Sequence, residues 1–239
     1  MSIDKENIKA VWLDLDDTLW DFSANSCESL RDLYEVEQLS RWFSSCDEWV
    51  ERYLECNHSL WPLYNKGEIT KEYLKVERFR RILNDADYSG DAEEYAKTLD
   101  VKYLDILGRK TLLVDGARDL LDYLKGQKYK ICLISNGFYE VQYNKMRSSQ
   151  IEEYFDVVVL SDDLNVNKPD RRIFDYACKK AEVSAEHSVI IGDNPETDIQ
   201  GALNAGWNAI YFNRIAMDNV ASPNGCLEVS GLREVKNIL

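Results

Sequence analysis

Five short apolar runs rich in β-branched residues recur along the chain, and four of them lie in its second half. These four are "YKICLIS" (129–135), "DVVVLS" (156–161), "SVIIGD" (188–193) and "NAIYF" (208–212), with a stretch of helical character between neighbours. This alternation is typical of βα units whose parallel strands are covered on both faces. The fifth run, "IKAVWLDLD" (8–16), has the same apolar and β-branched character. We therefore expect it to join the same sheet from far upstream.

Residues 24–110 show helical spacing and are dense in charged and aromatic residues. In "EITKEYLKVERFRRIL" the apolar positions step by three or four, which predicts an amphipathic helix; they are Ile69, Tyr73, Val76, Phe79 and Leu83. Gly67 predicts a turn just before a helix start at Thr70. This block is expected to be entirely helical.

The domain organisation follows from these two sequence patterns. We predict a Rossmann-like α/β core formed by residues 1–19 and 112–239, with a parallel sheet, and an all-helical insertion over residues 20–111. With 239 residues the chain can bury a full core. No internal repeat, low-complexity tract or Pro/Gly-rich linker interrupts it.

Composition narrows the classes of partner. The chain has 29 basic and 43 acidic residues, a net charge of -14, which disfavours binding to nucleic acid polymers or anionic membranes. Six cysteines without a CxxC pair predict free thiols in a reducing compartment. The polar start "MSIDKENIKA" and the lack of a long apolar run predict a cytoplasmic protein. The sequence carries no signal for the oligomeric state.

Particular polar residues follow the predicted strands. They are Asp14 and Asp16, then Ser135-Asn136-Gly137, then Lys168 in "NVNKPD", and then Asp193 with Asp198. The carboxyl ends of parallel strands lie along one edge of an open sheet and form its ligand crevice. We therefore expect these side chains to meet there.

Taken singly, each of these residues has an ordinary structural explanation. An aspartate after a strand is commonly a helix N-cap or a turn former, Ser-Asn-Gly is a turn, and a lysine before proline is a solvated lysine. The ordered set, from acid pair to hydroxyl to lysine to acid pair, favours a functional site instead.

The residue types point to phosphoryl chemistry. Asp14 and Asp16 are two apart in an extended segment, so both side chains can project on the same side, and Asp193 supplies a further carboxylate. Such a cluster suits Mg²⁺, which commonly binds one or two carboxylates together with substrate phosphate. Lys168 and the Ser135 hydroxyl can hold the remaining phosphoryl oxygens.

Catalysis is expected to proceed through a carboxylate. No Walker P-loop or GxGxxG loop is present. We therefore expect Asp14 to attack phosphorus, giving an aspartyl-phosphate, and Asp16 to protonate the leaving oxygen and later to activate water.

The motifs resemble those of the haloacid dehalogenase-like (HAD) hydrolases. "DLDDT" fits the DxDxT motif, "ISN" the Ser/Thr motif, "NKPD" the lysine motif and "GDNPETD" the GDxxxxD motif. The resemblance implies Mg²⁺ held by Asp14, the Asp16 main-chain carbonyl and Asp193, with Asp198 behind them. It makes the helical insertion a type 1 cap. Thr18, Asn136 and Gly137, which belong to the same motifs, are expected to bind substrate.

Narrower resemblances suggest a substrate class. Dehalogenases of this family lack the second aspartate, so Asp16 indicates a phosphatase. "LWPLYNKGEIT", "ISNGF" and "NKPDRRIFDYA" resemble the YjjG-type pyrimidine 5'-nucleotidases of bacteria, which implies a small phosphate monoester such as a nucleoside monophosphate as substrate. A sugar phosphatase or phosphoglucomutase would share every core residue and differ in the cap. A phosphoacceptor signalling domain gathers similar groups but needs neither a cap nor this length.

Aromatic residues near these motifs have two interpretations. Trp20, Phe22 and Phe138 lie close to them in sequence and are candidates for stacking on a base. Trp61 and Tyr64 are expected to pack between helices of the insertion.

Overall fold

The computed structural model describes residues 3–86, 88–214 and 223–239. The chain forms two compact units, Met1–Phe22 with Thr111–Leu239 and Ser23–Lys110. The first unit extends slightly beyond the predicted core limits of 19 and 112. Within this unit, main-chain hydrogen bonds join the segment that leads into the helical insertion to the segment that returns from it. They run from Val114 N–H to the Leu19 carbonyl (2.9 Å) and from Asp21 N–H to the Leu112 carbonyl (3.1 Å).

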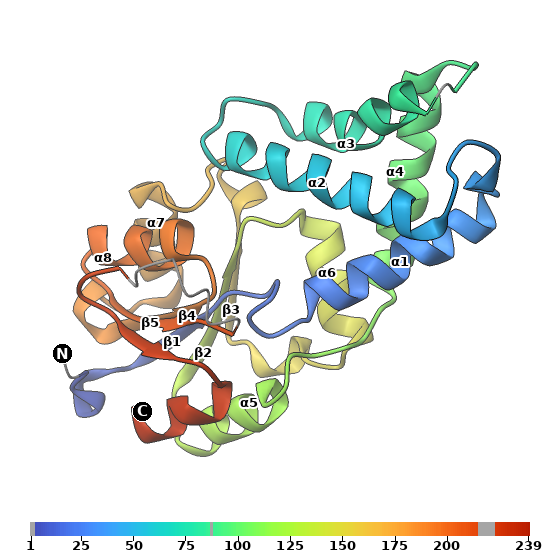
Figure 1. The fold of residues 1–239 in the computed structure, drawn as a ribbon. Helices are drawn as coiled ribbons and strands as arrows, with labels where there is room; N and C mark the ends of the chain where they lie inside the picture. The colour runs from blue at the N-terminus through green and yellow to red at the C-terminus, as the bar shows by residue number, and fades with distance from the viewer. Residues whose placement is uncertain (1–2, 87, 215–222) are drawn as a thin grey trace. The chain divides into compact units, whose positions relative to one another are not determined.

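The first unit contains a six-stranded sheet in the order β3-β2-β1-β4-β5-β6, and every pair of neighbours is parallel (Figure 1). The strands are β1 Ala10–Leu13, β2 Lys130–Ser135, β3 Val157–Leu160, β4 Ser188–Gly192, β5 Asn208–Phe212 and β6 Leu227–Val229. The five predicted strands are confirmed. The sequence did not predict β6, because three residues, one of them the exposed Glu228, are too few to show an apolar run.

The strand order reverses at β1, which lies between β2 and β4. Leu13 is in register with both Leu133 and Ile191. The residues that follow these three positions therefore emerge together at the carboxyl edge of the sheet. A reversal of this kind is where open α/β sheets form their ligand crevice.

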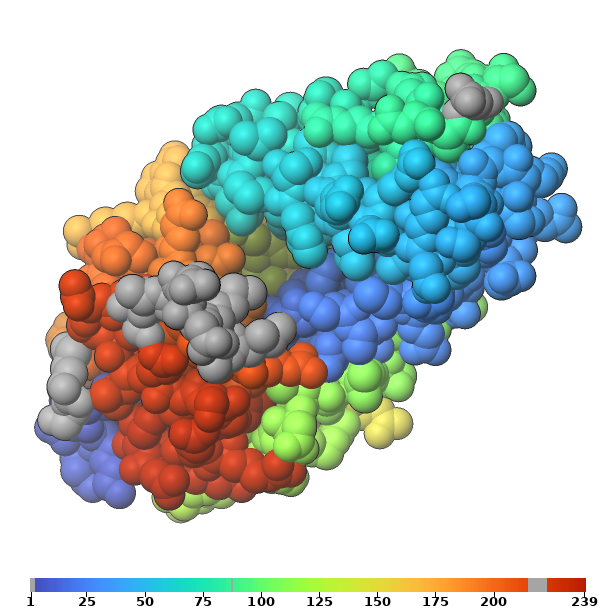
Figure 2. All heavy atoms as spheres, viewed as in Figure 1, coloured from blue at the N-terminus to red at the C-terminus, as the bar shows by residue number. Residues whose placement is uncertain are grey.

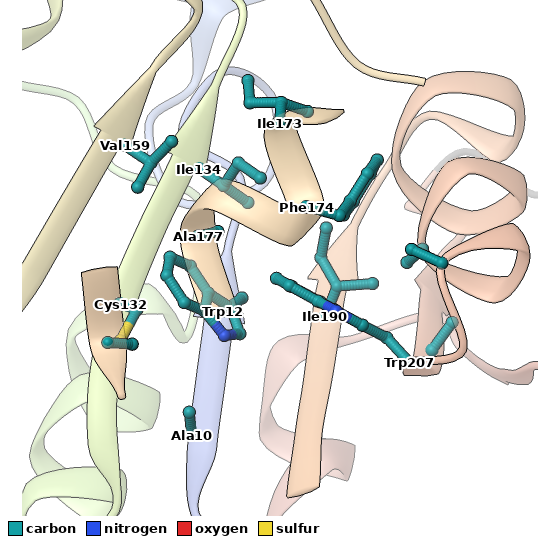
Figure 3. Packing of buried hydrophobic residues seen from close by; sticks show 14 of the residues in the cluster. Ala10, Trp12, Cys132, Ile134, Val159, Ile173, Phe174, Ala177, Ile190 and Trp207 are labelled. Atoms are coloured by element: carbon teal, nitrogen blue, oxygen red, sulfur yellow. The ribbon is translucent and has the colours of Figure 1, made fainter. Parts of the chain in front are cut away.

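Helices cover both faces of the sheet, as right-handed crossovers require (Figure 1). They are α5 Ala117–Gly126, α6 Tyr139–Ser148, α7 Arg171–Ala181 and α8 Gly201–Asn204. Buried residues of α7 and α8 pack with alternate residues of β1, β2 and β4 on one face. In Figure 3, Trp12 lies within this cluster near Trp207, with ring centroids 5.2 Å apart, and Phe174 meets Trp207 edge to face at 5.2 Å.

The second unit is helical, as predicted. Its helices are α1 Phe22–Val36, α2 Cys46–Asn65, α3 Lys71–Asp85 and α4 Ala92–Gly108, and α3 packs against both α2 and α4. The side chains of Ser45, Thr70 and Asp91 accept main-chain N–H bonds at the starts of α2, α3 and α4. In Figure 2, residues of α2 and α3 form much of the surface of this unit on the face shown.

The predicted face of α3 is partly wrong. Phe79 and Leu83 are buried, but Tyr73 is 44% exposed, and Leu74 and Ile82 are buried instead. Because α3 packs on two helices, its buried face is rotated from the one that the apolar spacing indicated. The turn at Gly67 (φ 72°) and the helix start at Thr70 are confirmed.

All six cysteines are free thiols, which confirms that prediction. Among the residues that the structure describes, no helix has the length and apolar character needed to cross a membrane.

Candidate active site

The first strand ends in a tight loop that carries Asp14 and Asp16. Asp14 N–H donates to the Ile191 carbonyl (3.0 Å), which continues the pairing with β4 for one more residue. The loop then turns at Asp17, whose φ of 57° is left-handed, and Trp20 N–H donates back to the Leu15 carbonyl (2.8 Å). The apolar strand thus stops where its acidic residues begin.

Lys168 occupies the centre of the site. It lies between β3 and α7, and its side chain is only 2% exposed. The ammonium donates to Asp14 Oδ1 (2.6 Å), Asp198 Oδ1 (2.6 Å) and the Ile134 carbonyl (2.9 Å). Three donors with three acceptors offset the cost of burying this cation.

Asn136 holds the main chain of Lys168. Its Nδ2 donates to the Lys168 carbonyl (2.9 Å), and its Oδ1 accepts from Lys168 N–H (2.8 Å). Asn136 therefore aligns the end of β2 with the segment that carries the lysine. Its predicted role in binding substrate stays a prediction.

Two further carboxylates come from the end of β4. Thr18 Oγ1 donates to Asp193 Oδ1 (2.9 Å), and Asn194 N–H donates to Asp198 Oδ2 (3.1 Å). A Cβ on Gly192 would lie 2.5 Å from Asp198 Oδ2, so only glycine fits this close approach. One carboxylate oxygen from each of Asp14, Asp193 and Asp198 lies within 4.8 Å of the other two.

The electrostatics of this cluster reflect an excess of acid. Desolvation raises the pKa of Asp14 to about 7; Lys168 opposes this rise, and Asp198 adds to it. Desolvation, with Asp198 and Asp14 nearby, also raises the pKa of Asp193 well above its usual value. Burial lowers the pKa of Lys168, but Asp14 and Asp198 raise it by more, so the net shift is upward. One ammonium thus faces three carboxylates.

This donor set fits a hard divalent cation. Carboxylate oxygens are the ligands that Mg²⁺ prefers, and a cation would offset the desolvation and the mutual repulsion that together raise both aspartate pKa values. Asp198 uses one oxygen on Lys168 and the other on Asn194 N–H. Asp14 and Asp193 are therefore the carboxylates best suited to contact the metal, and Asp198 is suited to lie behind them.

Ser135 lies at the end of β2 and is buried. Its Oγ accepts from Gly137 N–H (3.2 Å) and from Gln142 Nε2 (2.8 Å). A Cβ on Gly137 would lie 2.3 Å from the Gln142 side chain, so a larger residue here would displace Gln142. The turn after β2 therefore aims the hydroxyl toward a side chain of α6.

Asp16 has a cation of its own. Its Oδ1 accepts from Lys145 Nζ (2.7 Å), and its Oδ2 accepts from Gln142 Nε2 (3.0 Å). Asp14 and Asp16 are thus neighbours in sequence that bind different lysines. Sequence reasoning missed Gln142 and Lys145, because a glutamine and a lysine three residues apart in a polar helix look like solvated surface residues.

Among the predicted site residues, hydrogen bonds form two networks that adjoin in the main chain at Ser135 and Asn136. One joins Asp16, Ser135 and Gly137 through Gln142 and the Ser135 hydroxyl. The other is the group formed by Lys168 with Asp14, Asp198 and Asn136. Asp193, which accepts from Thr18, lies next to this group, because one of its carboxylate oxygens is within 4.8 Å of an oxygen of Asp14 and of Asp198. Trp20 and Phe138 are buried, so neither offers an open face for stacking on a base. Trp61 and Tyr64 pack edge to face within α2, and their predicted packing between helices stays a prediction.

Comparisons with known proteins identify a matching family and several relatives. The family model of haloacid dehalogenase-like hydrolases matches residues 8–206. HAD-hydrolase YfnB of Bacillus subtilis (strain 168) is 29% identical over 97% of this chain and 95% of its own. Its crystal structure, bound to magnesium and revealing interdomain movement, superimposes with a TM-score of 0.85 over 97% of this chain and 98% of that one.

Two curated relatives have a stated activity. Pyrimidine 5'-nucleotidase PynA of Streptococcus pneumoniae (strain ATCC BAA-255 / R6) is 29% identical over 97% of both chains. Pyrimidine 5'-nucleotidase YjjG of Escherichia coli (strain K12) is 27% identical over 96% of both chains. The similarity to both proteins spans nearly the whole chain.

Proposed function

The chain belongs to the haloacid dehalogenase-like hydrolase family, and from this premise we propose that it is a Mg²⁺-dependent phosphomonoesterase. The observation that carries the proposal is the pair of separately held aspartates. Lys168 binds one oxygen of Asp14 within an acidic cluster, while Lys145 and Gln142 hold Asp16. A nucleophile and an acid/base group need such different environments.

The reaction proceeds in two halves. A carboxylate oxygen of Asp14 attacks phosphorus, the ester P–O bond breaks, and Asp16 gives a proton to the leaving oxygen. Asp16 then takes a proton from water, which attacks the aspartyl-phosphate. Inorganic phosphate leaves, and Asp14 is regenerated. The hydrogen bond from Lys168 to Oδ1 leaves Oδ2 of Asp14 as the attacking atom.

The other residues orient the phosphoryl group and the metal. Lys168 and Ser135 are proposed to hold phosphoryl oxygens, with Thr18, Asn136 and Gly137 lining the substrate site. When bound, Mg²⁺ supplies positive charge that offsets the charge of the phosphoryl oxygens and the carboxylates. Asp14, the main-chain carbonyl of Asp16 and Asp193 would hold it, with Asp198 behind. The magnesium in the YfnB structure supports the proposed requirement for Mg²⁺.

Nucleoside monophosphates, and pyrimidine ones in particular, are the proposed substrates. The full-length similarity to two pyrimidine 5'-nucleotidases supports this choice. Residues 20–111, the proposed cap domain, would select the substrate and exclude water from the site. The six free thiols support activity in the reducing cytoplasm.

The test is phosphate release with Mg²⁺ from a panel of ribo- and deoxyribonucleoside monophosphates and sugar phosphates. Asp14→Asn serves as the inactive variant. Asp175→Asn, on the exposed side of α7 and 60% exposed, is the matched control. Preference for UMP, dUMP or dTMP supports the nucleotidase. Preference for sugar phosphates retains the mechanism and rejects the substrate, and no turnover of any ester rejects the phosphatase.

A further inference from the structure

Helix α6 places two polar residues in the interior of the α/β unit. Gln142 is fully buried and Lys145 is 2% exposed, three residues apart on one face of the helix. Burying an ammonium is costly unless its charge is paired and its donors are satisfied. A lysine that only stabilised α6 would extend into solvent. The burial of Lys145 therefore needs an explanation in its partners.

The partners of Lys145 converge on Asp16. Its Nζ donates to Asp16 Oδ1 (2.7 Å) and to Gln142 Oε1 (2.8 Å). The same atom lies 4.7 Å from the ring centroid of Trp20 and 5.3 Å from that of Phe22. Both rings belong to the segment that follows Asp16, so they hold the ammonium beside the catalytic loop through cation–π attraction.

Gln142 completes the hold on the carboxylate. Its Nε2 donates to Asp16 Oδ2 (3.0 Å) and to Ser135 Oγ (2.8 Å). Each oxygen of Asp16 therefore has its own donor, which restricts rotation of the carboxylate. Because the Asp16 side chain is 28% exposed, protein packing alone leaves it room to turn.

We infer that Lys145 and Gln142 are positioning residues that orient Asp16 toward the leaving oxygen of the substrate, a role that rests on the proposed function. A general acid must lie within about 2.6–3.2 Å of the atom that it protonates. Gln142 also connects this acid to Ser135, the proposed ligand of the phosphoryl group. The pair thus aligns the acid with the group that is being transferred.

The test compares two leaving groups. An alkoxide, as in uridine 5'-monophosphate, needs a proton to leave, whereas p-nitrophenolate does not. The ratio kcat/KM reports the steps up to the first irreversible one, here phosphoryl transfer to Asp14. Lys145→Met is expected to lower kcat/KM for the alkyl ester by about 100-fold and for p-nitrophenyl phosphate by less than about tenfold. Gln142→Met should show the same bias with a smaller loss.

A double mutant separates positioning from general damage. If Lys145 acts through Asp16, then Lys145→Met changes kcat/KM by no more than about threefold when Asp16 is already Asn. Lys130→Met is the matched control, because Lys130 is a partly buried lysine at the opposite end of β2 whose Nζ donates to the Ala181 carbonyl (2.7 Å). It should lower both kcat/KM values equally or not at all.

Two results would overturn the inference. One is an equal loss of kcat/KM on both esters for Lys145→Met and Gln142→Met. The other is a loss from Lys145→Met in the Asp16→Asn background that is as large as its loss in the wild type. If Lys145→Met does not fold, Lys145→Arg and Gln142→Met decide by the same ratio. A wild-type protein that hydrolyses neither ester, or an active Asp14→Asn, would instead reject the proposed function. The two failures are therefore distinguishable.

Discussion

Each of the two units buries a cation at the centre of a charge cluster, Lys168 in one and Arg78 in the other, and the surroundings of these two cations differ. In the α/β unit, Lys168 is 2% exposed and contacts Asp14 and Asp198. In the helical unit, Arg78 is 3% exposed and contacts Asp100, which is equally buried. Similar burial and short contacts therefore occur in two unrelated places.

The balance of charge distinguishes the two clusters. Around Asp100, a second cation, Lys75, lies 3.3 Å from the other carboxylate oxygen. The Arg78 guanidinium also lies 5.2–5.8 Å from the ring centroids of Tyr53, Phe79 and Tyr103. Burial lowers the pKa of Arg78, but Tyr53 and Asp100 raise it by more. Two cations share one acid here, whereas Lys168 contacts two acids, Asp14 and Asp198, and a third, Asp193, lies beside them.

This difference indicates what each cluster is for. A buried pair whose charges are balanced connects helices and fixes one arrangement of them. Around Lys168, desolvation and the neighbouring carboxylates raise the pKa of Asp14 to about 7, so this cluster gains stability when a cation or a ligand arrives. Active sites commonly carry such a stability cost.

The largest effect is expected from Asp14→Asn, which removes the nucleophile and leaves an amide in its place. Turnover should fall by at least about 1,000-fold, measured as phosphate release at saturating substrate. Without added metal, the melting temperature should stay the same or rise, because one repelling carboxylate is lost. A large drop in melting temperature would mean that the acidic cluster stabilises the fold, as the Arg78–Asp100 pair is expected to do.

In the helical unit, removal of a buried charge should instead destabilise the fold. Arg78→Met leaves Asp100 with only its more distant partner, Lys75, and should lower the free energy of unfolding by about 3–5 kcal/mol. Denaturant titration followed by circular dichroism measures this loss. Arg78→Met combined with Asp100→Leu removes both charges and should recover part of it. An unchanged midpoint in the single variant would argue against a structural pair.

Magnesium should stabilise the acidic cluster of the α/β unit. At a Mg²⁺ concentration of about 100 Kd, the expected gain is about 2.7 kcal/mol, seen as a rise in melting temperature. Asp193→Asn should lose most of this rise, whereas Asp100→Asn should keep it. An equal rise in Asp193→Asn would reject the predicted metal site.

The smallest effect is expected at the surface. Arg233 contacts Asp115 and Asp119, but all three side chains are more than half exposed. Because water and salt screen such pairs, Arg233→Ala should leave the unfolding midpoint within experimental error of wild type. A clear loss would show that burial is not what separates strong from weak charge clusters in this protein.

Five of the six strands, and the polar residues that follow them, could be predicted from local sequence patterns. β1 to β5 are apolar runs whose local pattern predicts buried parallel strands, and parallel strands bring their carboxyl ends to one edge. That geometry alone predicted that Asp14, Ser135, Lys168 and Asp193 would meet. The helical character of residues 24–110 followed from periodicity in the same way.

The neighbours of each of these groups depend on the tertiary structure. Gln142 and Lys145 on α6, and Arg78 on α3, belong to helices whose polar residues mostly face solvent, so spacing did not distinguish them. The buried face of α3 and the existence of β6 also depended on what packs against them. Local pattern encodes which face of an element is apolar, but a buried charge is explained only by a partner that is distant in sequence.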